Sequence, residues 1–92
     1  MAKRLEGYKD NDVELCRTTN SRVGEHTIRT LLEAQIPFTK NCKRIPFFLR
    51  EKYHGADRVW VIFTHPHRYG QARRILDAME RVYRERLILS NY

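Results

Sequence analysis

Two histidines separated by one residue, His65 and His67, are the side chains that most directly suggest chemistry in this sequence. Imidazoles two positions apart in an extended segment can reach one metal ion, but a zinc site also needs a third and a fourth ligand. His26, His54 and Cys16 do not lie at a diagnostic spacing from this pair. We therefore predict no metal site and no other cofactor, and we expect both histidines to lie in a solvated loop.

Catalysis has no comparable signature. The sequence contains no nucleophile elbow, no glycine-rich phosphate loop and no pair of carboxylates at a useful spacing. The acidic residues Asp10, Asp12 and Glu14 are better explained as a solvated approach to a strand. We therefore expect a protein that is not an enzyme and has no catalytic residues.

Size and charge limit the remaining functions. The chain has 92 residues, 41% of them hydrophobic, which suffices for one small domain with a single core. Its 18 Lys and Arg residues, mostly Arg, exceed 11 acidic residues and give a net charge of +7. Guanidinium groups suit phosphate and carboxylate partners. The isolated cysteines and the lack of a signal sequence or a long apolar run predict a soluble cytoplasmic protein without a membrane partner.

The first half of the chain predicts a strand, a helix and a second strand. Apolar and polar residues alternate over Val13–Thr18, which favours a strand, and residues 18–21 then supply candidate N-caps for a helix. Apolar residues at helical spacing continue from Ile28 until Pro37 ends the pattern. Residues 38–42 alternate again and predict a shorter strand, which its lysine places near an edge of the sheet.

The second half predicts a central strand followed by a long helix. Residues 59–63 are β-branched and aromatic, which favours a buried strand, and Pro66 suits the first turn of a helix. Apolar residues at helical spacing from Ala72 to Tyr83 predict one continuous helix. Residues 87–92 fit either a final strand or an extension of that helix, and we favour a short extended tail.

Residues 43–57 form a long connection between the second and third strands. They contain Pro46, Gly55 and the apolar sequence Phe47-Phe48-Leu49. A connection of this length is unusual in so small a domain. We expect it to fold back on the body of the protein, with Phe47 and Phe48 against one end of the core.

A strand, turn and helix pattern occurs twice in the chain. Val13–Thr18 and Arg22-Val-Gly24 have a similar counterpart, 46 positions later, in Val59-Trp-Val-Ile-Phe-Thr64 and Arg68-Tyr-Gly70. Two such units predict an α+β domain with the order β-α-β-β-α(-β), ferredoxin-like or PII-like, in which two helices cover one face of an antiparallel sheet. Residues 12–92 would form this domain, and residues 1–11 would form a flexible N-terminal arm.

The repeated unit also predicts a ligand site. We expect the first and third strands to be central, parallel neighbours, so that the loops after them emerge side by side. Two helix N-termini would then share one corner, with unpaired backbone N–H groups and positive dipole ends that suit a phosphate. The predicted ligand-binding residues are Thr18, Asn20, Ser21, Arg22, Thr64, His65, His67 and Arg68.

Two segments resemble a bacterial family of small domains assigned to signal transduction, whose fold is like that of the nitrogen-regulatory PII proteins. Leu31-Leu-Glu-Ala-Gln-Ile-Pro-Phe38 is similar to the family's leucine-rich helix end and the Ile-Pro strand start that follows it. Val59-Trp-Val-Ile62 and Gln71-Ala-Arg-Arg-Ile-Leu76 are similar to its later strand and helix. The chain lacks the family's usual glycine before Ile36 and carries the extra segment 43–57. The resemblance implies a fold and a regulatory or ligand-binding role, and it assigns no functional residues.

The face of the sheet opposite the helices is expected to be apolar. If the helices cover Val59 and Val61, the opposite face presents Cys16, Trp60 and Ile62. A monomer should not leave such a patch in water. We therefore predict a homo-oligomer whose interface contains these three residues, and the alternative cover is the apolar sequence of residues 47–49.

Nucleic acid is the main alternative to a small anionic ligand. The same order of elements serves the RNA-recognition fold, but the predicted open face offers only one aromatic residue, Trp60. Basic residues of the last predicted helix could still contact phosphates without reading sequence: Arg73, Arg74, Arg81 and Arg84. We therefore predict a non-enzymatic regulatory or ligand-binding module and rank nucleic acid below a small anion.

Overall fold

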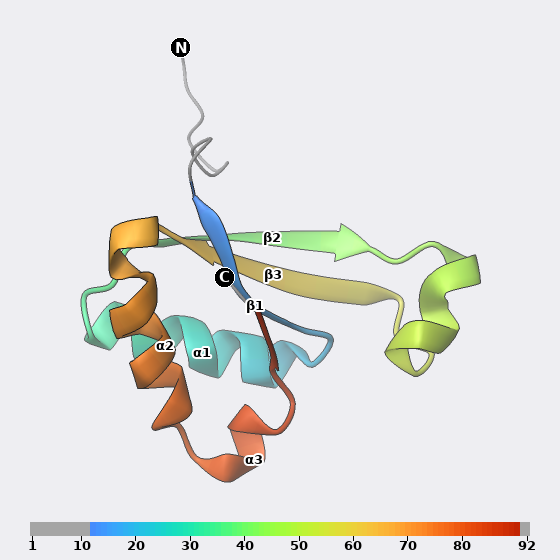
Figure 1. Ribbon diagram of the computed structural model, residues 1–92. Coiled ribbons are helices and arrows are strands. Elements are labelled where there is room, and N and C mark those ends of the chain that lie inside the picture. Colours follow the sequence, from blue (N-terminus) through green and yellow to red (C-terminus); the bar gives the residue numbers. More distant parts are fainter. Residues whose placement is uncertain (1–11, 91–92) are drawn as a thin grey trace.

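The computed structural model describes residues 12–90 as an α+β fold built on a four-stranded sheet. The strands are β1 (Val13–Thr18), β2 (Phe38–Arg44), β3 (Arg58–Thr64) and β4 (Ile88–Leu89), in the order β2-β3-β1-β4. Every neighbouring pair is antiparallel (Figure 1). The predicted antiparallel sheet with β1 and β3 at its centre is confirmed, whereas the arm predicted for residues 1–11 lies outside the described residues.

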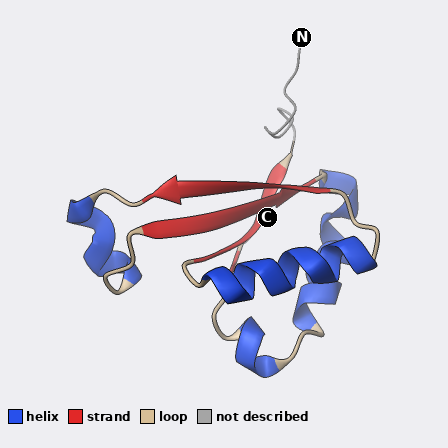
Figure 2. Cartoon of the chain, turned by 180° about the vertical axis from the view of Figure 1, so that it is seen from behind, coloured by secondary structure: helices blue, strands red, loops and turns tan. Residues whose placement is uncertain are grey.

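Helices α1 (Ser21–Glu33), α2 (Tyr69–Asp77) and α3 (Arg81–Arg84) lie on one side of the sheet (Figures 1 and 2). Two 3-10 segments complete the chain: η1 (Phe47–Tyr53) joins β2 to β3, and η2 (Pro66–Arg68) leads into α2. Within residues 12–90, no helix has both the length and the apolar character needed to cross a bilayer. The helix-side core consists of Leu15, Cys16, Val23, Leu31, Ile36, Ile62, Ala72, Leu76 and Leu87.

α1 begins and ends where the sequence predicts. The side-chain oxygen of Asn20 accepts hydrogen bonds from the backbone N–H groups of Arg22 (2.9 Å) and Val23 (3.1 Å), which makes it the N-cap. After the helix, Gln35 adopts a left-handed φ of 60°, and Pro37 follows two residues later. Because neither conformation continues a helix, the chain turns into β2.

The continuous helix predicted from Ala72 to Tyr83 is wrong. α2 ends at Asp77, Glu80 is extended with φ −57° and ψ 143°, and α3 starts one residue later. Nη2 of Arg84 donates to a carboxylate oxygen of Asp77 at 2.8 Å, and this contact ties α3 to the end of α2. Apolar periodicity alone did not reveal the break because no glycine or proline marks it.

The break returns the chain to the sheet. Leu87 is buried in the helix-side core, and β4 then pairs with β1 through the opposed residues Cys16 and Leu89. Residues 87–92, which the sequence left open, therefore include a short strand. A continuous helix would have carried these residues away from β1. The break after α2 therefore allows β4 to form.

The predicted assignment of the two sheet faces is wrong. Cys16 and Ile62 have no exposed surface and lie beneath the helices, and Trp60 lies close to Gly24 of α1, where an added Cβ would be 3.6 Å from its ring. A shift in register between Glu14 and Cys16 breaks the alternation of β1 at that point. The interface predicted for Cys16, Trp60 and Ile62 is therefore occupied by the chain's own helices.

The opposite face of the sheet has a smaller core of its own. Val59 and Val61 of β3 pack there with Ile45, against the partly buried residues Tyr53 and Ala56. The connection of residues 43–57 thus folds back on the sheet as predicted, but through Tyr53 and Ala56. The apolar residues expected to make this contact are exposed instead: Phe47, Phe48 and Leu49.

Candidate functional site

The two loops predicted to form one corner lie at opposite ends of the sheet. β1 and β3 are antiparallel, so Val13 is opposite Thr64 and Thr18 is opposite Trp60. β3 follows β2 through a reversing connection, and it lies between β2 and β1 and runs against both. The predicted parallel pairing was therefore wrong. Thr18, Asn20, Ser21 and Arg22 do not meet Thr64, His65, His67 and Arg68.

The loop after β3 has polar groups that serve local structure. Nδ1 of His65 accepts a hydrogen bond from the backbone N–H of His67 at 3.1 Å, which caps η2. Thr64 Oγ1 donates to the carbonyl of Pro37 at 2.9 Å, and Arg68 Nε donates to Gln71 at 3.0 Å. In the part of the chain that the structure describes, no three His, Cys, Asp or Glu side chains gather into a metal site.

The loop after β1 attaches the end of the chain to the sheet. Thr18 Oγ1 donates to the backbone carbonyl of Arg86 at 2.8 Å and accepts from the backbone N–H of Asn20 at 3.1 Å. Thr18 and Asn20 therefore have structural partners, while the side chain of Arg22 is exposed. The contact with the carbonyl places Arg86, which the sequence did not indicate, beside the start of α1.

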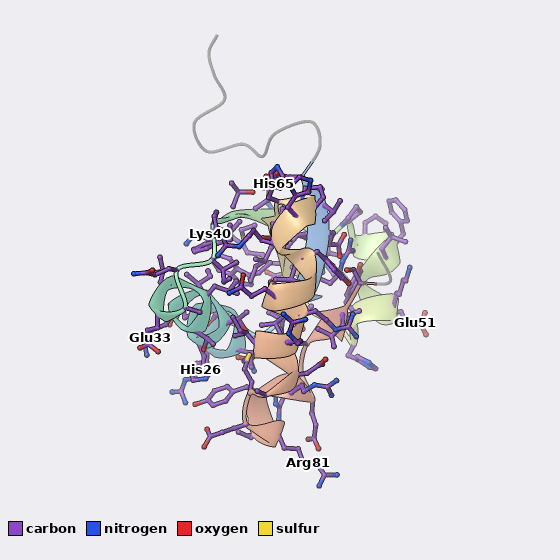
Figure 3. All side chains as sticks on the ribbon, turned by 60° about the vertical axis from the view of Figure 1, so that its left-hand side comes forward. His26, Glu33, Lys40, Glu51, His65 and Arg81 are labelled. Carbon is purple, nitrogen blue, oxygen red and sulfur yellow. The ribbon has the colours of Figure 1, made fainter. Side chains whose placement is uncertain are left out.

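A groove of about 510 Å³ lies between α1 and α3 at this end of the molecule. His26 of α1 stacks on Tyr83 of α3, with ring centroids 3.8 Å apart and an angle of 9° between the planes. Figure 3 shows His26 and Arg81 far from His65, which marks the opposite end. The residues that line the groove are Asn20, Arg22, Val23, Glu25, His26, Arg29, Val82, Tyr83 and Arg86.

Three arginines in the groove have no acidic partner among the described residues: Arg22, Arg29 and Arg86. Other arginines do have such partners: Arg17 pairs with Glu14 at 2.7 Å and Arg81 with Glu85 at 2.8 Å. The groove contains one carboxylate, from Glu25, against these three guanidinium groups. It is therefore positively charged, with hydrogen-bond donors available to an anion.

The arginines proposed for nucleic acid on the last predicted helix are mostly engaged elsewhere. Arg84 donates to Asp77 at 2.8 Å, and Arg81 pairs with Glu85. Nη1 of Arg73 donates to the Tyr69 hydroxyl and to the Ser90 carbonyl. Among the predicted four, only Arg74 is exposed and makes no ion pair with another residue of the described range 12–90. Arg22, Arg29 and Arg86 of the groove are not among these four.

A second hollow, of about 360 Å³, adjoins the groove. It shares Asn20 and Arg86 with the groove and extends to Lys52, Tyr53 and His54 on and after η1. Glu85 also lines it, but this carboxylate is paired with Arg81. The two hollows therefore adjoin at Asn20 and Arg86, and basic residues line both of them, from Arg22 of α1 to Lys52 of η1.

Part of the groove has a signal in the sequence. Arg22, His26 and Arg29 are spaced by four and three residues, which places them on one face of α1, opposite its buried residues. Tyr83 and Arg86 have no such signal, because they reach the groove only through the break before α3.

No family model matches this chain, and comparison with curated proteins and with solved structures found no match. Function is therefore inferred from the geometry and charge of the groove.

Proposed function

We propose that this chain is a non-enzymatic regulatory or ligand-binding module that holds a phosphate-bearing anion in the groove between α1 and α3. The proposal keeps the predicted class of ligand and moves its site. The strand order β2-β3-β1-β4, with the helices on one face, supports a ferredoxin-like or PII-like fold for the module. The family resemblance of the sequence is consistent with such a role.

The observation that carries the proposal is the convergence of Arg22, Arg29 and Arg86 on one groove without acidic partners among residues 12–90. Like charges gathered in one place oppose folding, and an anion between them would remove that cost. Guanidinium groups also present paired N–H donors that match two phosphate oxygens.

The stacked rings add a second type of contact. His26 and Tyr83 are half-buried, and both residues line the groove. The imidazole of His26 can donate a hydrogen bond to an anion. No serine, cysteine or lysine is among the residues that line the groove. This composition favours binding over covalent chemistry.

The test is a thermal unfolding series in inorganic phosphate and pyrophosphate. A ligand that binds only the folded state raises the midpoint of unfolding, and the rise grows with the logarithm of the ligand concentration relative to its Kd. Arg29→Ala should weaken binding roughly tenfold or more, because a hydrogen bond to a charged group contributes about 1.5–3 kcal/mol.

The matched control is Arg74→Ala, which removes an exposed guanidinium outside the groove. Arg74→Ala and Arg29→Ala have the same net charge. The control should keep the wild-type response to both anions. An equal response in Arg29→Ala and Arg74→Ala would show that the anions act only through the overall charge, and the groove would lose its proposed role.

A further inference from the structure

We infer that the ligand is a single-stranded nucleic acid. Its phosphates would lie along both hollows, and its bases would stack on the exposed aromatic residues of η1. This inference rests on the proposed function and names its class of ligand. Three features support it: the shared border of the two hollows, the exposed rings of η1, and the basic residues that flank η1 in the chain.

The two hollows share a border, and two adjoining basic hollows fit an extended ligand better than a single anion. Arg86 borders both hollows, so a phosphate bound beside it has neighbours on either side. In one direction are Arg22 and Arg29, and in the other are Lys52 and His54. A single phosphate could occupy only one of these positions, whereas a strand could use them in succession.

The second hollow reaches Lys52 and Tyr53 at the end of η1, and two exposed aromatic residues stand at the start of the same segment. Phe47 and Phe48 expose 79% and 72% of their surface, and neither belongs to a core cluster. Their ring centroids are 5.9 Å apart and the ring planes are perpendicular, so the two rings meet edge to face. Figure 1 shows η1 projecting from one end of the sheet, beyond the helices. Exposed rings beside a basic groove are the usual platform for unpaired bases.

Exposed basic residues flank η1 in the chain. Arg44 of β2 and Arg58 of β3 are directly opposed in the register, and both are exposed. Like charges in opposed positions destabilise a sheet. Lys43 and Lys52 lie nearby in the chain and are also exposed. This end of the molecule therefore favours an anionic occupant.

These charges also decide between occupants. A second copy of the chain would bring the same positive residues against each other, so it is disfavoured. An anionic membrane could take the exposed apolar residues of η1, but a flat surface would not use Arg22 and Arg29 inside the groove. A single strand uses both the groove and the rings. It would be held by its backbone and by stacking, with little preference for sequence.

The test measures fluorescence anisotropy of a labelled twelve-nucleotide uridine strand, alongside thermal stabilisation by inorganic phosphate. The double substitution Phe47→Ser and Phe48→Ser should weaken strand binding roughly tenfold or more, because each stacked base contributes severalfold. It should leave stabilisation by phosphate unchanged. Leu32→Ser removes another exposed apolar side chain on the far part of α1 and is the control that should bind the strand normally.

Salt dependence gives a second measurement. Lys52 lines only the second hollow, so Lys52→Ala should reduce the slope of log affinity against log salt by about 0.7, the value for one phosphate contact on a single strand. Arg74→Ala should leave that slope unchanged.

The outcomes separate this inference from the proposed function. If phosphate still stabilises the protein through Arg29 but the phenylalanine variant binds the strand as wild type does, the inference is overturned and the groove stands. If the strand binds through Phe47 and Phe48 while phosphate has no Arg29-dependent effect, the proposed groove fails. Binding to phosphatidylserine vesicles that requires both phenylalanines, with no binding to the strand, would overturn the inference in favour of a membrane surface.

Discussion

His26 and Tyr83 stack with their ring centroids 3.8 Å apart, and this contact joins the first helix of the chain to the last. The groove exists because the chain breaks after α2 and turns Tyr83 toward α1. Stability and binding are therefore linked at this stack. Each prediction below follows from one contact in this region or from one buried group of the core.

Tyr83→Ala should loosen α3 selectively. The substitution removes a half-buried ring and its stacking partner, and we expect the free energy of unfolding to fall by about 2 kcal/mol. Amide hydrogen exchange should accelerate more in residues 78–90 than in α1. Uniform acceleration across both regions would mean that the stack does not hold α3 in place.

Asp77→Asn should weaken the contact between Arg84 of α3 and the end of α2, and it should change the pH dependence of stability. The hydrogen bond from Arg84, together with the charge of Arg73, lowers the pKa of Asp77 below its ordinary 3.8. A lowered carboxyl pKa contributes stability above pH 3.8, and that contribution is lost as the pH falls further. The unfolding midpoint of wild type should exceed that of the variant at pH 6, and the difference should shrink as the pH falls below 3.8.

The control for Asp77→Asn is Glu80→Gln, which removes an exposed carboxylate that makes no ion pair within residues 12–90. It should follow wild type across this pH range. A difference between wild type and Asp77→Asn that does not shrink as the pH falls below 3.8 contradicts the role given to ionised Asp77.

The two cysteines should differ sharply in reactivity. Burial raises the pKa of the Cys16 thiol from 9.0 to about 12, whereas Cys42 is exposed on β2. Because the thiolate is the reactive form, a three-unit rise lowers its population at pH 8 by roughly a thousandfold. A thiol reagent should modify one cysteine quickly, and Cys42→Ser should abolish that fast phase. Rapid modification of Cys16 in the folded protein would show that the helices do not cover this face of the sheet.

The same burial predicts a loss of stability at alkaline pH. The unfolded chain releases the Cys16 proton near pH 9, while the folded chain keeps it until about pH 12. The unfolded state is therefore favoured progressively between these values. The stability of wild type should fall more steeply over pH 9–11 than that of Cys16→Ala, as measured by urea unfolding. Parallel curves for the two proteins would exclude Cys16 as the source.

The order of elements and the class of fold could be predicted from the sequence, because strands and helix starts depend on local residues. β1 matches its predicted bounds, and Asn20 caps α1 from within the predicted cluster of N-cap residues. The choice of sheet face could not be predicted, because β3 is apolar on both sides: Val59 and Val61 on one, Trp60 and Ile62 on the other. Alternation fixes which residues share a face but does not fix which face meets the helices.

The candidate site was harder to predict than the fold because it depends on contacts between distant segments. Arg22, His26 and Arg29 share a face of α1 and could have been grouped from their spacing. Arg86 joins them only because Thr18 holds its carbonyl, and Tyr83 only because α2 ends early. The loop of His65 and His67 was predicted to join the site only because the first and third strands were expected to be parallel. Their antiparallel pairing places it at the other end of the sheet.

The most direct measurement is an NMR titration of the ¹⁵N-labelled chain with inorganic phosphate, followed through its backbone amide signals. Our account predicts saturable shifts concentrated in residues 20–29 and 82–86, with the loop of His65, His67 and Arg68 unaffected as an internal control. Shifts centred on that loop, or small shifts spread evenly over the basic surface, would contradict a phosphate site between α1 and α3.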